Sequence, residues 1–315
     1  MDLSPVQPVL AAVAADVAIV GEGRARLATG EEFATGGASG PVGGLTEALY
    51  GRHYCRPQAP SNSESEDPAT FLEALRAANG VPARFETWTV AGTDAGGLTV
   101  VSPLGAQRRV GYHEATPGPG GLTPGQAIRI AVARETVTAS HFAVFGRAIA
   151  DAASGRQVRF YWNLAPAGAA PFIGAVTQSF ERRRIPFHAK VPIAPLGYRR
   201  ADGGVLYLDA EDVEAALDLV AAVRQEVAAF LRPETPLFAR PLVPGVAFAE
   251  SPPGRESFGI NRCRLLAEGL VQGFMAGKPA EVAMLERLLA YGIAPEAPER
   301  NPATAYPYRF GAWVG

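Results

Sequence analysis

The chain has 315 residues, enough for one large domain or two ordinary ones at roughly 100–200 residues per domain, so it can bury a substantial core. Hydrophobic residues make up 48 %, charged residues 19 %, and the formal net charge is -2. This balance argues against a disordered charged tail, and against a protein that binds nucleic acid or an acidic membrane surface through bulk charge. Any cationic site must therefore be local.

Arginine supplies almost all of the positive charge. Of the 29 Lys and Arg residues only Lys190 and Lys278 are lysines. Because arginine fills the surface roles that lysine usually has, each lysine is a candidate for a role that arginine cannot play. Lys278 stands between two predicted helices, and there we expect an exposed turn residue.

The cysteines and the N-terminal apolar stretch bear on compartment and anchoring. Cys55 and Cys263 are too few for a disulfide framework, and no Cys/His cluster has the spacing of a zinc site. We expect a cytoplasmic protein without a metal or other cofactor. The apolar stretch 9–20 is too short for a membrane span and is interrupted by Asp16, so it predicts an amphipathic helix rather than an anchor or signal peptide.

Residues 1–80 predict a helical N-terminal region. Helices are expected over 3–20 and 45–54, with a glycine-rich loop between them. Pro68 suits the first position of a third helix, which Gly80 would end.

Residues 81–135 predict a small β-rich segment, and residues 136–315 an α+β region that carries the site; the chain also fits one continuous domain. Strands are expected at 85–90, 98–101, 108–112, 127–133, 157–164, 187–193 and 205–208. Helices are expected at 168–184, 210–231 with Asp209 as N-cap, 258–275 and 279–291. Strands and helices follow one another without regular βαβ units. This order predicts an α+β fold with a mixed, mainly antiparallel sheet flanked by helices.

Several common catalytic motifs are absent from the sequence. There is no phosphate-binding P-loop, no dinucleotide-binding fingerprint between a strand and a helix, and no G-x-S-x-G. The four histidines, at positions 53, 113, 141 and 188, lack metal-ligand spacing. These absences disfavour nucleotide binding and serine hydrolase chemistry.

The segment 158–164 alternates polar and apolar residues. On a strand, Arg159, Tyr161 and Asn163 would share one face and the apolar residues would face the core. A cation, a phenol and an amide in a row would line a site for an anionic ligand. An ordinary solvent-facing strand gives the same pattern.

The next predicted strand places His188 and Lys190 on one face. A desolvated ammonium group beside other cations can have its pKa lowered from ~10.4 towards neutrality, whereas a guanidinium stays charged. Lys190 is therefore a candidate general base; the alternative is a strand-edge lysine that faces solvent.

Further charged residues follow on the C-terminal side. Arg200 and Asp202 alternate directly before the strand at 205–208. Arg262 and Arg264 stand near the start of a predicted helix, where a cation opposes the helix dipole. That position makes sense if an anion binds there.

Together these segments resemble the HopA-type effector family. The matching motifs are RFYWN (159–163), PFHAKV (186–191), YRRADGGVLYL (198–208), FGINRCRLLAEGL (258–270), the element at 49–54 and FLEALRAANG (71–80). The resemblance covers about residues 45–310. Some members of the family are type III effectors of plant pathogens, and others act in class V lanthipeptide and thioamitide biosynthesis. In composition this chain is more similar to the second group.

The resemblance implies a phosphoserine/phosphothreonine lyase. Such an enzyme eliminates phosphate from a phosphorylated precursor (leader-core) peptide after a partner kinase has phosphorylated it, and the product contains dehydroalanine or dehydrobutyrine. The order Arg159, Tyr161, Lys190, Arg200 is also similar to that of phosphothreonine lyases, except that Tyr161 stands where those enzymes have histidine.

On this interpretation each candidate residue has a role. Lys190 abstracts the α-proton, and Tyr161 or His188 protonates the leaving group, unless phosphate leaves without a strong donor. The phosphate and substrate ligands are Arg159, Arg200 and Arg262, with Arg264 as a helper and Asn163 and Asp202 as orienting residues. The cations supply the electrostatics, so no metal or cofactor is expected.

Two other functions fit the same residues. One is a non-catalytic subunit that binds a phosphopeptide or the kinase, and the other is a type III effector that acts on a host protein. A binding subunit would tolerate Lys190→Arg, which keeps the charge, whereas a general base would not.

Overall fold

The computed structural model describes residues 5–60, 66–101, 107–147, 149, 155–254, 256–302, 304 and 306–311. The chain divides into two compact units, one formed by Met1–Gly80 with Val137–Gly315 and the other by Val81–Thr136. We call them unit 1 and unit 2. Within the described residues, no helix is both long and apolar enough to cross a bilayer.

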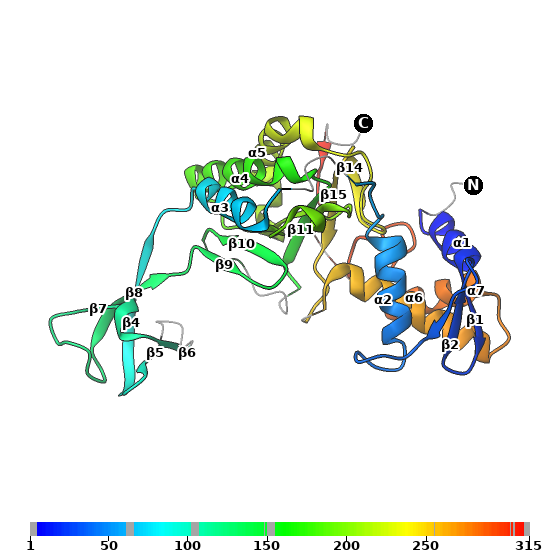
Figure 1. The fold of residues 1–315 in the computed structure, drawn as a ribbon, viewed down its shortest axis with the longest axis horizontal. Coiled ribbons are helices and arrows are strands. Elements are labelled where there is room, and N and C mark those ends of the chain that lie inside the picture. Colours follow the sequence, from blue (N-terminus) through cyan, green and yellow to red (C-terminus); the bar gives the residue numbers. More distant parts are fainter. Residues whose placement is uncertain are drawn as a thin grey trace. The chain divides into compact units, whose positions relative to one another are not determined.

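Unit 1 is built on a seven-stranded sheet of order β14-β15-β11-β13-β12-β10-β9 (Figure 1). Its strands are β9 (Glu135–Val137), β10 (His141–Phe145), β11 (Gln157–Trp162), β12 (His188–Pro192), β13 (Gly204–Asp209), β14 (Arg240–Val243) and β15 (Val246–Glu250). The pairs from β14 to β10 are all antiparallel. The α+β fold with a mainly antiparallel sheet is thereby confirmed.

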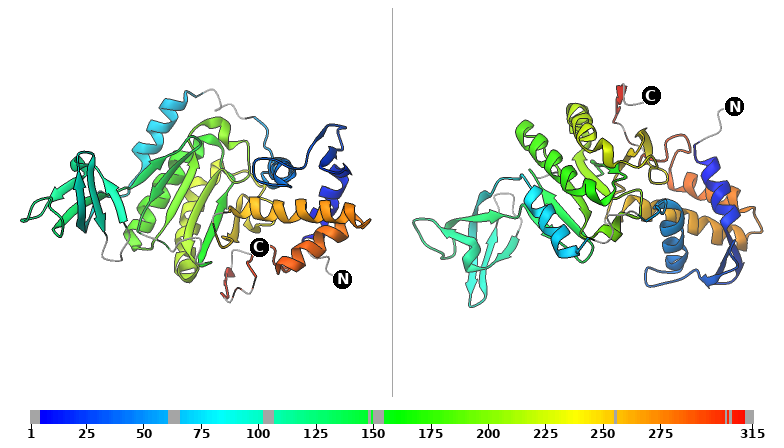
Figure 2. Two further views of the ribbon diagram at one scale, coloured as in Figure 1. Left: turned by 90° about the horizontal axis from the view of Figure 1, so that it is seen from below. Right: turned by 45° about the horizontal axis from the view of Figure 1, so that its top comes forward.

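One face of this sheet is covered by helices and forms an aromatic core. The helices are α3 (Pro68–Ala78), α4 (Ala169–Arg183) and α5 (Val213–Val227), which lie together on one side (Figure 2). Trp162 of β11 packs on Phe172 of α4, with ring centroids 5.3 Å apart. The apolar members of the alternating strands therefore point to this core, as their sequence predicts.

The predicted helix ends are confirmed at α3 and α4 and corrected at α5. Pro68 occupies the first turn of α3, and the side chain of Asp67 caps it by accepting from the Thr70 N–H. The helix expected over 210–231 is α-helical only over Val213–Val227 and has a 3₁₀ turn at each end. Asp209 precedes the first of these turns and makes no side-chain capping bond to it.

A second group of helices packs beside the sheet. It comprises α1 (Gln7–Asp16), α2 (Gly43–Leu49), α6 (Phe258–Met275) and α7 (Ala280–Tyr291), and Figure 2 shows α6 and α7 crossing next to α1. The helices predicted at 258–275 and 279–291 are confirmed. Gly269 lets α6 and α7 approach closely, because a Cβ there would lie 2.7 Å from the Met284 Cα atom.

The predicted N-terminal helices are partly wrong. Helix α1 ends at Asp16, and the chain continues as β1 (Val17–Gly21), which pairs with β2 (Arg24–Leu27) and then β3 (Glu32–Ala34) in a small antiparallel sheet. The β-branched residues after Asp16 favour a strand over a helix. Positions 3 and 4 of the expected helix lie outside the described residues. The second expected helix is α-helical to Leu49 and continues as a π-helical turn over Tyr50–Tyr54.

Unit 2 is a five-stranded antiparallel sheet of order β6-β5-β4-β8-β7. Its strands are β4 (Arg84–Asp94), β5 (Gly97–Val101), β6 (Gln107–Val110), β7 (Ala115–Pro117) and β8 (Ala127–Val132). It has its own small core, formed by Val90, Leu98, Val100, Val110, Ile128 and Ile130.

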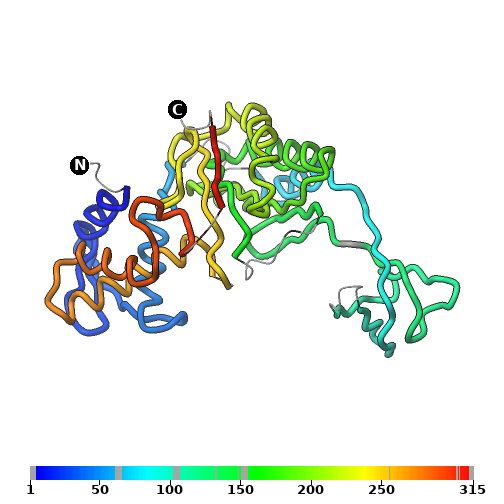
Figure 3. The backbone as a smooth tube through the Cα atoms, turned by 180° about the vertical axis from the view of Figure 1, so that it is seen from behind, coloured from blue at the N-terminus to red at the C-terminus, as the bar shows by residue number. Residues whose placement is uncertain are grey.

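Asn301, Thr304 and Tyr308 are held against β15 by a buried carboxylate, and Figure 3 shows residues 306–311, in red, running beside strands β14 and β15. The Glu250 side chain, 1 % exposed, accepts hydrogen bonds from the Asn301 N–H, the Thr304 hydroxyl and the Tyr308 hydroxyl at 2.6–2.8 Å. The Asn301 amide also donates to the Ser251 carbonyl at 2.7 Å. Three donors satisfy a carboxylate that would otherwise be costly to bury.

Candidate active site

The candidate site lies on the sheet face opposite α4 and α5. Strand pairing places Arg159 of β11 opposite Tyr207 of β13. Two residues further along the strands, Val205 of β13 pairs with Tyr161 of β11 on one side and with Lys190 of β12 on the other. The central strands therefore bring two cations and two phenols to one face, although their residues are up to 48 positions apart in sequence.

A pocket of about 80 Å³ opens over these residues. We call it the cationic pocket; it is lined by Tyr50, Tyr54, His141, Arg159, Tyr161, Lys190, Arg200, Asp202, Gly203, Val205, Tyr207, Ser257 and Gly259. Two arginines and one lysine stand against one aspartate in the lining, so the formal charge of the pocket is positive.

The start of α6 forms one wall of the pocket. Ser257 is its N-cap, and its hydroxyl accepts from the Ile260 N–H. The first N–H groups of a helix lack intrahelical partners and carry partial positive charge, which favours an anion nearby. Gly259 is needed for packing, because a Cβ there would lie 2.4 Å from the Tyr54 ring.

Arg159 is fixed from behind by a buried serine. Its Nε donates to the Ser251 hydroxyl at 2.8 Å, and that hydroxyl donates to Gln157 Oε1 at 2.9 Å. Its guanidinium lies 5.2 Å from the Tyr207 ring centroid. Arg159 is 8 % exposed and Ser251 fully buried, so this geometry leaves the guanidinium little freedom.

Arg200 is held by Asp202 and a tyrosine. Its Nε and Nη2 donate to the two carboxylate oxygens of Asp202, and Nη2 also donates to the Tyr50 hydroxyl at 2.5 Å. A bidentate pair of this kind fixes the plane of the guanidinium. Asp202 thus orients one of the arginines, which is the role the sequence suggests for it.

Lys190 has no hydrogen bond or ion pair with any other described residue. Its Nζ lies 5.7 Å from the Tyr207 ring centroid. The other lysine differs, because Lys278 is exposed and forms an ion pair with Glu286 at 2.6 Å. The ammonium in the pocket is therefore available to a ligand.

Besides Lys190, the pocket groups that could transfer a proton include His141 and Tyr161. Burial, helped by the charges of Lys190 and Arg200, lowers the pKa of His141 to about 4. Burial raises the pKa of Tyr161, while the charge of Arg159 lowers it in part. The Tyr161 hydroxyl is buried, and it interacts with Arg159 and Tyr54. Both groups are thus neutral at neutral pH.

Asn163 and His188 lie outside the cationic pocket. Asn163 is fully buried and its amide donates to the Glu234 carbonyl at 3.0 Å, so it holds a loop. His188 shares the face of Lys190, as predicted, but packs against Phe145 in a neighbouring cavity. Neither residue is placed to touch an anion in the cationic pocket.

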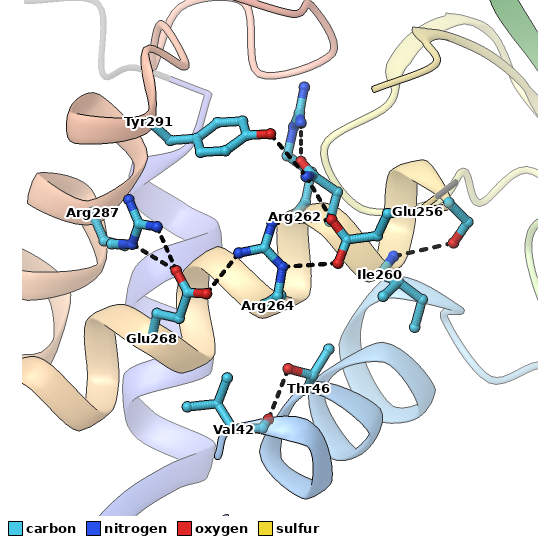
Figure 4. A network of polar contacts seen from close by, with 11 residues as sticks. Val42, Thr46, Glu256, Ile260, Arg262, Arg264, Glu268, Arg287 and Tyr291 are labelled. Carbon is cyan, nitrogen blue, oxygen red and sulfur yellow. Dashed lines mark hydrogen bonds and ion pairs between the residues drawn. The ribbon is translucent and has the colours of Figure 1, made fainter. Parts of the chain in front are cut away.

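Arg262 and Arg264 are also used elsewhere. Arg262 is fully buried and donates to the carbonyl oxygens of Pro298 and Arg300 at 2.9 and 2.7 Å. Arg264 bridges Glu256 and Glu268, in the network that Figure 4 shows around α6. Carbonyls and carboxylates therefore supply the negative partners that an arginine at this end of the helix needs.

Several pocket residues were not singled out from the sequence as site residues. His141 lies on β10, a strand that the sequence analysis does not predict, although the segment HFAVF (141–145) alternates between half-buried and buried residues. Tyr50 and Tyr54 lie on the π-helical turn, a feature often found at functional sites. Within the described residues, no three His, Cys, Asp or Glu side chains group closely enough to hold a metal ion.

The fold and site define an α+β protein with a small cationic pocket on an antiparallel sheet. The sequence model of the HopA1 effector protein family matches residues 132–300, the region that contains most of the pocket. The chain belongs to the HopA1 effector protein family.

A solved structure shows the same fold. An effector protein from Pseudomonas syringae pv. tomato strain DC3000 is 20 % identical, with a TM-score of 0.50 over 82 % of this chain and 90 % of that chain. An effector protein from Pseudomonas syringae pv. syringae strain 61 is 17 % identical, with a TM-score of 0.49 over 82 % of this chain and 98 % of that chain. A comparison with curated proteins found no match.

Proposed function

We propose that this protein is a lyase that eliminates phosphate from phosphoserine or phosphothreonine in a peptide. The supporting observation is the cationic pocket itself. Arg159 and Arg200 are held rigidly by Ser251 and Asp202, while Lys190 beside them has no partner within the described residues. Rigid donors aimed at one small space suit a departing phosphate dianion.

The elimination needs a base, an anion cradle and a proton donor. Lys190, in its neutral amine form, accepts the α-proton, and the electron pair of the Cα–H bond forms the Cα=Cβ double bond. The Cβ–O bond breaks and its electrons leave with the phosphate, which Arg159, Arg200 and the N-terminus of α6 bind. The product is dehydroalanine or dehydrobutyrine.

Two groups can protonate the leaving oxygen. Tyr161 is buried and neutral, and its hydroxyl lies beside the guanidinium of Arg159. His141 is neutral when the pocket is empty, and a bound phosphate dianion would raise its pKa by offsetting the neighbouring cations. Loss of activity in Tyr161→Phe but not His141→Asn, or the reverse, assigns the donor.

The substrate on this proposal is a phosphorylated precursor peptide of a class V lanthipeptide or thioamitide pathway, supplied by a partner kinase. The motifs at 159–163, 186–191 and 198–208 support it through their resemblance to lyases of such pathways. The effector structures of similar fold favour a second candidate, in which the same pocket acts on a phosphorylated host protein.

The direct test is mass spectrometry of phosphothreonine and phosphoserine peptides after incubation with the protein. We expect loss of phosphoric acid with the wild type and with the control Lys278→Arg. Lys190→Ala and Lys190→Arg should be slower by about 10²–10⁴, the usual contribution of a positioned base. Binding without elimination, together with full tolerance of Lys190→Arg, would instead support a non-catalytic phosphopeptide-binding subunit.

A further inference from the structure

A second cavity adjoins the cationic pocket on the same face of the sheet. Its volume is about 210 Å³, and it shares Lys190 and Tyr207 with the cationic pocket. The remaining lining residues are Ala143, Phe145, Gln157, His188 and Ala189. We call this cavity the side subsite.

Strand register fixes the position of the side subsite. Phe145, His188, Tyr207 and Arg159 follow one another in a single row across β10, β12, β13 and β11. Neighbouring strands are about 4.8 Å apart, so His188 lies about 10 Å from Arg159 across the sheet. Along β12 it lies two residues, or about 7 Å, from Lys190.

The walls of the side subsite consist of three aromatic rings, two alanines, a glutamine and Lys190, the only charged residue among the lining residues of this cavity. Phe145 and His188 meet edge to face, with ring centroids 4.8 Å apart. Burial lowers the pKa of His188 to about 4, with Asp209 opposing, so the ring is neutral at neutral pH. The Gln157 side-chain oxygen is already engaged by Ser251. No carboxylate lines the cavity.

The size of the cationic pocket explains why a substrate must extend beyond it. At about 80 Å³ it has room for the phosphorylated side chain but not for a peptide. The rest of the substrate must cross neighbouring surface. In an extended peptide, side chains two positions apart point the same way and lie about 7 Å apart, which matches the spacing of Lys190 and His188.

We propose that the side subsite binds an apolar side chain of the phosphopeptide, two positions from the phosphorylated residue. This inference rests on the proposed function, because it assumes that the ligand of the cationic pocket is part of a peptide. It gives His188 a role in substrate selection, as part of the wall against which the apolar side chain packs.

The test uses two sets of short phosphothreonine peptides. Each set carries Leu, Gly or Asp at one position from -2 to +2, with Gly at the others. The first set is used to measure kcat/KM. The second set contains a phosphonate in which carbon replaces the bridging oxygen, so that it binds without eliminating, and its Kd is measured by fluorescence anisotropy.

We expect Leu to be preferred over Gly by about tenfold at one of these positions, as burial of part of a leucine side chain predicts. Asp should be disfavoured there. Phe145→Ala should reduce the Leu/Gly ratio to about 2 or less, and the exposed Phe85→Ala in unit 2 is the matched control. Ala143→Lys, which adds a charge at the wall, should invert the preference from Leu to Asp even if Phe145→Ala folds poorly.

The two proposals fail in different ways. Equal Kd values for Leu, Gly and Asp peptides at every position, or ratios unchanged in both Phe145→Ala and Ala143→Lys, would overturn the side subsite. A Leu preference in phosphonate binding, with no elimination from any phosphothreonine peptide, would support the subsite and overturn the lyase function.

Discussion

Replacing Ser251 by alanine tests whether Arg159 depends on its buried anchor. The change removes the hydrogen bond from Arg159 Nε and the bond to Gln157 Oε1. A bond to a charged group contributes about 1.5–3 kcal/mol and a neutral one about 1 kcal/mol, so Ser251→Ala should lower the free energy of unfolding by about 2–4 kcal/mol. The backbone bonds of residue 251 remain, because they do not involve the hydroxyl.

The same change should weaken catalysis beyond its effect on stability. A guanidinium that is no longer fixed should bind phosphate less well, and a loss of about 1.4–2.8 kcal/mol corresponds to a KM raised ten- to a hundredfold. Urea unfolding and phosphate release measure the two effects. Thr177→Val is the control, because it removes another buried hydroxyl on α4, far from the pocket, and should cost stability alone. A free energy of unfolding within about 0.5 kcal/mol of the wild-type value is less than one typical hydrogen bond contributes. That result, together with an unchanged KM, would refute the anchoring role.

Three further outcomes are expected. Gly259→Ala should lower thermal stability and kcat/KM together, because its Cβ would meet the Tyr54 ring at 2.4 Å; a fully active, equally stable variant would contradict this. Asp67→Ala should cost about 1 kcal/mol in urea unfolding through loss of the cap on Thr70, without changing kcat/KM. Because the folded pKa of His141, about 4, lies below its ordinary value of 6.5, its contribution to stability is complete above pH 6.5 and is lost as the pH falls towards 4. Between pH 6.5 and 4 the melting temperature of the wild type should therefore fall more than that of His141→Gln. Melting temperatures that fall in parallel with pH in the two proteins would contradict this contribution of His141.

Strand alternation allowed much of the sheet to be predicted. A period of two placed Arg159 with Tyr161 and His188 with Lys190 on shared faces, and the structure shows the same arrangement. The alternation of polar and apolar residues within a strand does not reveal which strands are neighbours in the sheet. His141 was therefore not connected with Lys190, although β10 pairs with β12 and both residues line the pocket.

The arginines of α6 show where local reasoning fails. An arginine near a helix N-terminus indicates a negative partner, but the sequence does not say which one. For Arg262 the partners are carbonyl oxygens 36 and 38 positions away. For Arg264 they are glutamates on its own helix and just before it. Such tertiary partners become visible only when the chain is folded.

The carboxylate of Glu250 links Asn301, Thr304 and Tyr308 to the sheet face that carries the cationic pocket. Its neighbour Ser251 anchors Arg159, and these three residues hold Glu250. A chain shortened to residue 300 would leave a buried anion without these donors, next to the serine that holds Arg159. Tags and truncations on this protein should therefore be placed elsewhere, since shortening the chain here would disturb the cationic pocket although none of its lining residues had been changed.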